Sequence, residues 1–344
     1  MKQIGHIIVL RFSAMGDVAT VVPVVKALLQ QHPSLRITLV SNGFFAPLFA
    51  GIERCDFFAV ATKSQHKGVG GLFKLFQQLK KDKQHFAVAD LHNVLRTKLV
   101  KFFFTLSGAR VASIDKGRAD KKKLTAHNNK VLRQLPTSHA RYAKVFAALG
   151  FPVNLKDHIK LAANPLPERV ASSVAPGKML VGVAPFAQHA PKMYPLEKMK
   201  TFLQQLQATQ PVQLLFFGAP GNEAATLQQW QQEFAGSINI AGAISFAEEL
   251  QVISNLKMMI SMDSANMHLA SMYNVPVLSI WGATHPFAGF YGFNQPDENI
   301  AQVSLYCRPC SVFGNKPCHR GDHACMHLIS TEMLLQKAAA ILQR

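Results

Sequence analysis

The feature that most constrains the fold of this chain is a regular alternation of short apolar runs with longer segments of helical periodicity. A run rich in Ile and Val at residues 6–11 is followed by a short loop, and residues 18–31 then show apolar side chains at helical spacing. A second strand pattern covers residues 36–41. This order of strand, glycine-containing loop, helix and strand predicts a parallel α/β sheet, in which ligands bind at the carboxyl ends of the strands.

The same alternation continues and then restarts. Further strands are predicted at residues 57–61, 86–90 and 110–113, and further helices at 72–81, 94–106 and 139–149. The pattern breaks over residues 164–178, where prolines and small residues gather. Beyond the break, strands are predicted at 179–184, 212–217, 238–240, 258–262 and 275–281, and helices at 196–206, 223–234, 246–254, 266–272 and 331–342. The sequence therefore predicts two doubly wound domains, at residues 1–165 and 176–328, followed by a last helix within 329–344.

Charge is distributed unevenly between the two halves. The chain carries 37 Lys and Arg against 19 Asp and Glu, a net charge of +18, yet residues 161–344 are neutral, with 11 of each sign. The whole excess lies in residues 1–160 and much of it in one cluster: Lys116, Arg118, Lys121, Lys122, Lys123, Lys130 and Arg133. Because no aromatic residue interleaves this cluster, it does not resemble a nucleic-acid surface. We expect the first half to meet an acidic partner, such as an anionic membrane surface, with a merely solubilising role as the alternative.

Targeting and membrane-spanning signals are absent from the sequence. The first apolar run is interrupted by Arg11, and no stretch of about 18 uncharged apolar residues exists. We therefore expect a cytosolic protein with a globular composition, 49% hydrophobic and 16% charged.

Three loops follow predicted strands and carry candidate functional groups. Asp17 lies between the first predicted strand and the first predicted helix. Its carboxylate either faces a ligand or only caps the helix and interacts with the helix dipole. Residues 262–268, MDSANMH, lie between a strand and a helix, where exposed backbone N–H groups favour a diphosphate. An ordinary capped helix is the alternative there. Lys192 is the only cation in the loop at 185–195, and it either neutralises phosphate or is simply solvated.

Other ligand motifs are missing or weak. The run from Gly68 to Gly71 follows no strand and lacks dinucleotide-binding spacing, so we interpret it as a loop. The chain has no phosphate-binding loop of the kinase type and no Asp-x-Asp pair. Cys307, Cys310, Cys318 and Cys325 have the spacing C-x2-C-x7-C-x6-C, and the sequence leaves reduced thiols, a zinc site and disulfides all open.

Two motifs together carry a family resemblance. Residues 11–18, RFSAMGDV, and residues 262–270, MDSANMHLA, followed by WGATHP at 281–286, resemble the signatures of the ADP-heptose:lipopolysaccharide heptosyltransferases of glycosyltransferase family 9. The resemblance implies a GT-B fold, with two Rossmann-like domains facing a central cleft, the acceptor on the first and the nucleotide sugar on the second. It also implies that the last helix crosses back to the first domain.

The resemblance further implies an inverting transfer without metal or cofactor, at the inner face of the cytoplasmic membrane, from ADP-heptose to the inner core of lipopolysaccharide. Asp17 matches the general base, and Lys192 matches the lysine that stabilises the departing diphosphate. The implied donor-binding residues are Glu223, Ile244, Asp263, Ser264, Ala265, Asn266, Met267, His268 and Thr284. The implied acceptor-binding residues are Ser13, Met15, Gly16, Asp90, His92, Asn93 and Arg96.

The chain departs from the family pattern in the donor loop. Ala265 stands where the family usually has glycine, and the loop before Lys192 lacks the usual hydroxyl residues. The alternatives are therefore a related transferase that uses another nucleotide sugar for a cell-envelope glycan, or a basic protein that binds anions or lipid without chemistry.

Overall fold

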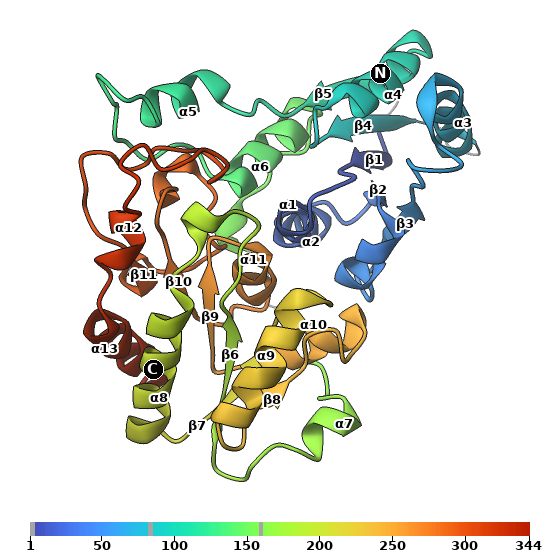
Figure 1. Cartoon of the computed structure of the whole chain (residues 1–344). Coiled ribbons are helices and arrows are strands. Elements are labelled where there is room, and N and C mark those ends of the chain that lie inside the picture. Colours follow the sequence, from blue (N-terminus) through green and yellow to red (C-terminus); the bar gives the residue numbers. More distant parts are fainter. Residues whose placement is uncertain (1–3, 82–84, 158–160) are drawn as a thin grey trace. The chain divides into compact units, whose positions relative to one another are not determined.

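A computed structural model describes residues 4–81, 85–157 and 161–344 (Figure 1). Their contacts divide the chain into two units, each with its own sheet. Unit 1 is built from the described parts of Met1–Lys116 and Ser138–Ile159, and unit 2 from those of Gly117–Thr137 and Lys160–Arg344. None of the helices in these described ranges has both the length and the apolar character that a membrane span requires.

The sheet of unit 1 is parallel, with strand order β3-β2-β1-β4-β5 in the described residues. Its strands are β1 (His6–Leu10), β2 (Arg36–Ser41), β3 (Cys55–Ala59), β4 (Phe86–Asp90) and β5 (Arg110–Ser113). The central strand β1 is buried from Ile7 to Leu10, as a parallel strand covered on both faces requires. The register pairs Leu10 with Val40 on one side and Asp90 on the other, so β1, β2 and β4 end at the same edge.

The helices of unit 1 connect these strands. They are α1 (Met15–Ala19), α2 (Val21–Gln31), the 3-10 helix η1 (Gly43–Phe49), α3 (Gly68–Lys80), α4 (Leu95–Leu106), α6 (Ser138–Ala148) and the 3-10 helix η2 (Leu155–Asp157). The single helix predicted over residues 18–31 is divided at Thr20. Pro23 explains the break, because it lacks an N–H and its ring would clash with the carbonyl of Ala19 in a continuous helix.

The glycine run predicted to be a loop is instead the first turn of α3. Gly68 has a positive φ of 69°, which suits glycine, and Gly71 packs so closely on His66 that a Cβ there would lie 2.5 Å from its backbone carbon. His66 is buried, accepts a hydrogen bond from the Ala61 N–H and contacts Gln78 through its other ring nitrogen. The glycines therefore let the helix begin directly against a buried turn.

The sheet of unit 2 is also parallel, with strand order β11-β10-β9-β6-β7-β8 in the described residues. Its strands are β6 (Met179–Ala184), β7 (Val212–Phe216), β8 (Ile238–Asn239), β9 (Met258–Met262), β10 (Val277–Ile280) and β11 (Ile300–Ala301). Its helices are α5 (Arg118–Leu124), α7 (Glu168–Ala171), η3 (Ala190–Lys192), α8 (Leu196–Thr209), α9 (Asn222–Glu233), α10 (Phe246–Ser254), α11 (Ala265–Met272), η4 (Pro286–Ala288), η5 (Asp297–Asn299), α12 (Ala324–His327) and α13 (Thr331–Leu342).

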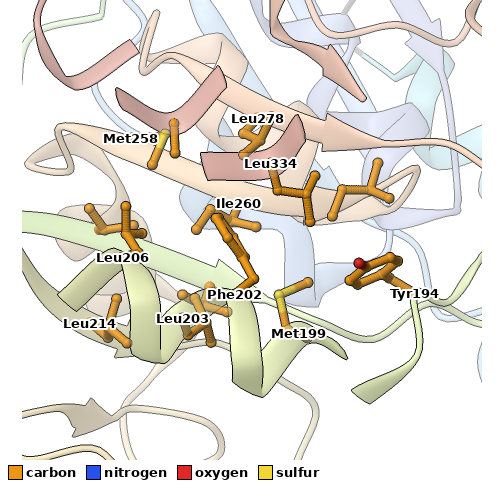
Figure 2. Close-up of a cluster of buried hydrophobic side chains, with 14 of the residues drawn as sticks. Tyr194, Met199, Phe202, Leu203, Leu206, Leu214, Met258, Ile260, Leu278 and Leu334 are labelled. Carbon is orange, nitrogen blue, oxygen red and sulfur yellow. The ribbon is translucent and has the colours of Figure 1, made fainter. Parts of the chain in front are cut away.

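The last helix completes the hydrophobic core of unit 2. Figure 2 shows Leu334 of α13 above the side chains of α8, such as Phe202, and of the central strand β9, such as Ile260. Tyr194 closes one end of the cluster and donates its hydroxyl hydrogen to the Ile329 carbonyl at 3.0 Å. The helix α13 belongs to unit 2 and lies along α8 (Figure 1), and its crossing to the first domain stays a prediction.

Residues 117–137 belong to unit 2 by their contacts, although they precede the division expected at residues 165–176. Leu124 and Leu135 are buried with Ala288 of the loop after β10, and the Leu135 N–H donates to the Phe287 carbonyl at 2.9 Å. Local periodicity carries no information about such a partner, since the contact joins segments far apart in the sequence.

This assignment moves much of the basic cluster out of unit 1. Unit 1 carries 19 Lys and Arg against 7 Asp and Glu, and unit 2 carries 18 against 12, when each is counted over its full sequence ranges. Both units are therefore basic when the chain is divided by its contacts, although residues 161–344 by themselves are neutral.

Candidate functional site

In each sheet, successive strands are added first on one side of the first strand and then on its other side. The place where the side changes is the switch point of that sheet. In unit 1 this point lies between β1 and β4, and in unit 2 it lies between β6 and β9. In open parallel sheets the crevice beyond the carboxyl ends of these two strands is the usual ligand site. The predicted catalytic residues follow these strands: Asp17 comes after β1, and Lys192 comes after β6.

Asp17 lies in the first turn of α1 and forms an ion pair with Arg11, the residue that follows β1. The Arg11 side chain is 7% exposed and that of Asp17 is 38% exposed, so the pair presents the carboxylate outward. Arg11 also donates through Nη1 to the Leu91 carbonyl at 2.8 Å, which ties the β1 loop to the β4 loop. Arg11 stands in the same motif as Asp17 but is not among the site residues that the sequence predicts.

Tyr142 of α6 contacts both residues of this ion pair. Its ring lies 6.0 Å from the Arg11 guanidinium, and its hydroxyl donates to the Asp17 carbonyl at 3.3 Å. The ring is buried, and burial raises its pKa well above the ordinary tyrosine value. Tyr142 is therefore a neutral hydrogen-bond donor that orients the start of α1.

The loop after β4 holds three of the predicted acceptor-binding residues. Asp90 is fully buried, and its Oδ1 accepts the backbone N–H groups of His92 at 3.0 Å and Asn93 at 2.8 Å. Asn93 has a positive φ of 46° and donates to the Ile114 carbonyl at 2.9 Å. Asp90 and Asn93 therefore shape the turn, and His92 and Asn93 are both partly exposed.

His92 joins this loop to the first motif. Its Nδ1 accepts the Phe12 N–H at 3.4 Å, and the two rings stack edge to face. Burial, with the charges of Arg11 and Lys116, lowers the pKa of His92 to about 4. The ring is therefore neutral at physiological pH and offers an acceptor and a donor instead of a charge.

The remaining acceptor-side residues lie around this edge at the surface. Ser13 is exposed, Met15 and Gly16 are partly exposed in the first turn of α1, and Arg96 is exposed in the first turn of α4. Unit 1 thus presents a carboxylate, a neutral imidazole and a guanidinium at the carboxyl edge of its sheet.

In unit 2 the structure brings the two predicted donor loops together. Lys192 Nζ lies 3.1 Å from Asp263 Oδ2, and the two side chains are 14% and 9% exposed. Asp263 directly follows β9, and Ser264 is the N-cap of α11. A cation therefore stands next to a helix N-terminus whose first turn carries Ala265 and Asn266, an arrangement suited to a phosphate group.

The other donor-side residues divide by burial. Met267 is buried beneath the first turn of α11 and contributes to the core, whereas Asn266 and His268 are partly exposed. The Ser264 hydroxyl lies 3.1 Å from that of Ser261, a contact that joins β9 to the cap residue. Ser264, Ala265, Asn266 and His268 are thus the partly exposed residues of this segment.

The loop after β10 meets the Lys192 loop. The Ala283 N–H donates to the Pro191 carbonyl at 3.2 Å, and Thr284 is fully buried beside it. Arg308, a buried residue that no sequence motif predicts for the site, donates to the carbonyls of Gly282 at 2.6 Å and Thr284 at 3.1 Å. The Thr284 side chain is therefore part of the protein interior, and hydrogen bonds from Arg308 fix the conformation of its loop.

Glu223 and Ile244 follow the next two strands of the same edge. Glu223 accepts the Ala219 N–H at 2.7 Å and so closes the loop between β7 and α9. Gly242, in the loop after β8, lies so close to Pro220, in the loop after β7, that a Cβ on Gly242 would be 3.1 Å from the Pro220 Cβ. The two loops are therefore in contact. Glu223 and Ile244 are both partly exposed there.

The cysteines near the C-terminus are free thiols in the structure. Among the residues that the structure describes, no three His, Cys, Asp or Glu side chains already stand in a metal-binding arrangement. Cys307, Cys310, Cys318 and Cys325 nevertheless line one small cavity.

Comparisons with known proteins identify a matching family and similar folds. The family model described as glycosyltransferase family 9 (heptosyltransferase) matches residues 72–317. A family 9 glycosyltransferase from Veillonella parvula is similar in structure, with a TM-score of 0.75 and 18% identity over 100% of this chain and 99% of that chain.

Two Escherichia coli structures are similar as well. The ADP-heptose lipopolysaccharide heptosyltransferase II has a TM-score of 0.69 and 17% identity over 98% of each chain. Heptosyltransferase WaaC with ADP has a TM-score of 0.70 and 17% identity, over 98% of this chain and 99% of that chain. At such identities the likeness shows a shared fold, the GT-B fold, and no curated protein sequence matches the chain.

Proposed function

The chain belongs to glycosyltransferase family 9, and on that premise we propose that it transfers a heptose from ADP-heptose to the inner core of lipopolysaccharide, with inversion. The observation that carries the proposal is the position of Lys192 beside the N-terminus of α11, at the switch point of the unit 2 sheet. A diphosphate needs a cation and a row of backbone N–H groups, and this edge supplies both.

Lys192 and α11 would stabilise the leaving group. When the bond between the anomeric carbon and the diphosphate breaks, negative charge grows on the departing phosphate oxygen. An ammonium group and a helix N-terminus held in place beforehand favour that charge without reorganisation. Lys192 has three N–H donors, so it keeps one for Asp263 and has others for phosphate.

Asp17 would act as the general base. It accepts the proton of the acceptor hydroxyl while that oxygen attacks the anomeric carbon from the face opposite the diphosphate, which inverts the configuration. The Arg11 ion pair orients the carboxylate, and the partial exposure of Asp17 leaves it accessible to an acceptor. His92, neutral at physiological pH, offers the acceptor a hydrogen bond.

A donor panel tests this function. Purified protein is given ADP-heptose, ADP-glucose, UDP-glucose and GDP-mannose with a heptose-deficient lipopolysaccharide acceptor, and product is measured by mass spectrometry. We expect transfer from ADP-heptose. Transfer from a different nucleotide sugar alone would contradict the heptose assignment, and Ala265, in place of the family's usual glycine, is then the first residue to examine.

The reaction is proposed to need no divalent metal in the active site. Lys192 and the N-terminus of α11 supply the positive field that a metal ion provides in other transferases. Initial rates with and without added Mg²⁺ or Mn²⁺ should agree, and a strict requirement for either ion would contradict this part of the proposal.

We further propose that unit 1 docks on the inner face of an anionic membrane through α3 and α4. Exposed apolar side chains lie along both helices: Val69, Phe73, Leu95, Phe102 and Leu106. The two helices pack together, with the rings of Phe73 and Phe103 5.2 Å apart. Exposed cations, including Lys74 and Lys98, flank the apolar residues. Apolar insertion combined with anionic attraction is the usual basis of peripheral binding.

The basic cluster of residues 116–133 is a weaker candidate for this contact. Lys121 is buried with its ammonium 4.0 Å from the Phe290 ring, Arg133 pairs with Asp120, and Lys130 donates to the Cys307 carbonyl. These three cations interact with other residues of unit 2, so fewer basic side chains of the cluster are available to bind lipid.

Vesicle sedimentation distinguishes the two surfaces. The double variant Lys98→Glu with Phe102→Asp should lose binding to vesicles rich in phosphatidylglycerol, whereas the exposed pair Lys122→Glu with Lys123→Glu should lose much less. Equal binding by the first variant and the native protein at low salt would contradict docking through α3 and α4.

A further inference from the structure

The segment between β11 and α12 is long and has no helix or strand of its own. It covers residues 302–323, all of which the structure describes, and it contains three of the four clustered cysteines. Loops of this length are uncommon in a domain unless something holds them, because their backbone gains little from secondary structure. The contacts within this segment therefore indicate what holds it.

The four cysteines converge on one cavity. Its lining includes Cys307, Cys310, Cys318 and Cys325, together with His319 and His323. The cavity has a volume of about 10 Å³, which is room for roughly one water-sized particle.

Two cations stand beside this thiol cluster. Lys130 Nζ donates to the carbonyls of Cys307 at 2.8 Å and Pro309 at 3.0 Å, so its charge lies against the C-x2-C turn. Arg308, within the same turn, is 5% exposed and gives its donors to surrounding carbonyls. A dication bound by four thiolates has a net charge of −2, which these two positive groups would balance.

We propose that Cys307, Cys310, Cys318 and Cys325 bind one tetrahedral metal ion, zinc or iron, that fixes residues 302–323 against the donor loops. Both ions accept four thiolate ligands in this geometry. The described side chains do not yet stand at ligand distances, so the ion must draw the four sulfurs together, and binding releases the four thiol protons.

The proposed site is structural, and it connects to the donor site through its own loop. Gly314 lies against the Lys192 side chain, where a Cβ would be 2.4 Å from Lys192 Cγ, and Arg308 holds the Gly282 and Thr284 carbonyls. Metal binding would therefore stabilise the wall that positions Lys192 without touching the sugar donor.

Metal analysis of the native protein is the first test. The protein is expressed in media supplemented with zinc or iron and purified without chelating resins, and its metal content is measured by mass spectrometry. We expect about one ion per chain. A visible absorption band identifies iron thiolate, and zinc gives none. Native protein with well under one ion from both media, or with a disulfide among these cysteines, would overturn the proposal.

Variants locate the ion. Cys318→Ser should lower the metal content at least about fivefold, because a structural site with three thiolates and no fourth ligand binds much more weakly. Cys55→Ser is the matched control, since Cys55 lies in β3 of unit 1, and it should keep the full content. Cobalt added to metal-free native protein gives a second measurement that does not depend on the folding of a variant. Absence of tetrahedral thiolate bands, or full metal content in Cys318→Ser, would contradict the site.

Discussion

At the scale of single residues, both proposed catalytic groups are held by a neighbour of opposite charge. Arg11 holds Asp17 in unit 1, and Asp263 holds Lys192 in unit 2. In each pair one member follows a strand at the switch point, and the pairing limits the rotamers of a side chain that would otherwise be mobile. The charges are therefore already in position before a substrate arrives, which is what electrostatic catalysis requires.

Replacing Asp17 with asparagine tests the proposed general base. Asp17→Asn keeps the size and the helix-start geometry but cannot accept the acceptor proton. We expect kcat to fall by about 10²-fold or more while ADP binding, measured by calorimetry, stays unchanged. Asp56→Asn is the control, because Asp56 is an exposed surface partner of Arg36 and should leave kcat unaltered. Near-native turnover in Asp17→Asn would rule out this role.

Replacing Lys192 tests the diphosphate contact. Lys192→Ala removes the cation next to α11 and leaves Asp263 without its partner, so both attraction and local neutrality are lost. ADP affinity should drop by about tenfold or more, and transfer should slow as well. Lys178→Ala removes an exposed lysine elsewhere in unit 2 and serves as the control. An unchanged dissociation constant for ADP in Lys192→Ala would show that this lysine does not bind phosphate.

At the scale of elements, the start of α3 shows how close packing decides where a helix begins. Gly70 and Gly71 are adjacent, yet a Cβ at Gly70 meets nothing within 4 Å whereas one at Gly71 runs into the His66 backbone. Glycine is intrinsically unfavourable inside a helix, so its presence at Gly71 reflects the buried turn beneath it.

These neighbouring glycines make a matched pair for a stability measurement. Gly70→Ala should raise the free energy of unfolding by about 0.5–1 kcal/mol, because alanine loses less backbone entropy in a helix. Gly71→Ala should lower it by about 1–3 kcal/mol, because His66 and its turn must move. Urea denaturation of the two variants beside the native protein measures both, and effects of the same sign would contradict this account of the α3 start.

At the scale of the whole molecule, each unit contains a histidine that desolvation and nearby cations keep neutral at physiological pH. The pKa of His92 in unit 1 and that of His285 in unit 2 are each lowered to about 4, first by burial and then by nearby cations. Arg11 and Lys116 act on the first, and Arg308 and Lys130 act on the second.

This arrangement predicts acid sensitivity. Between the ordinary histidine pKa of 6.5 and the lowered value of about 4, the unfolded chain binds protons that the folded protein does not. Stability should therefore be full above about pH 6.5 and should decrease as the pH falls toward 4. Melting temperatures across this range measure the effect. His92→Asn should flatten the unit 1 part of the dependence, and a control change at the exposed His127 should leave it intact.

The sequence by itself determined the strand and helix alternation of both units, and most of the predicted strands agree with the structure. It also indicated which loops to propose as the site, because residues after a strand in a parallel sheet come to one edge and the family motifs fall in those loops. Asp17, Lys192 and the donor segment from Asp263 to His268 could be selected in this way. The burial of Asp90 and Thr284 could not, because each depends on a neighbouring loop.

Only the tertiary structure decided which surfaces meet. It placed residues 117–137 and α13 with unit 2, paired Arg11 with Asp17 and Lys192 with Asp263, and gathered the four cysteines around one cavity. The physical reason is that periodicity records which side of an element is buried and leaves open what buries it. That choice is made by long-range packing and by the need to pair buried charges and backbone groups, and both arise only when the strands assemble.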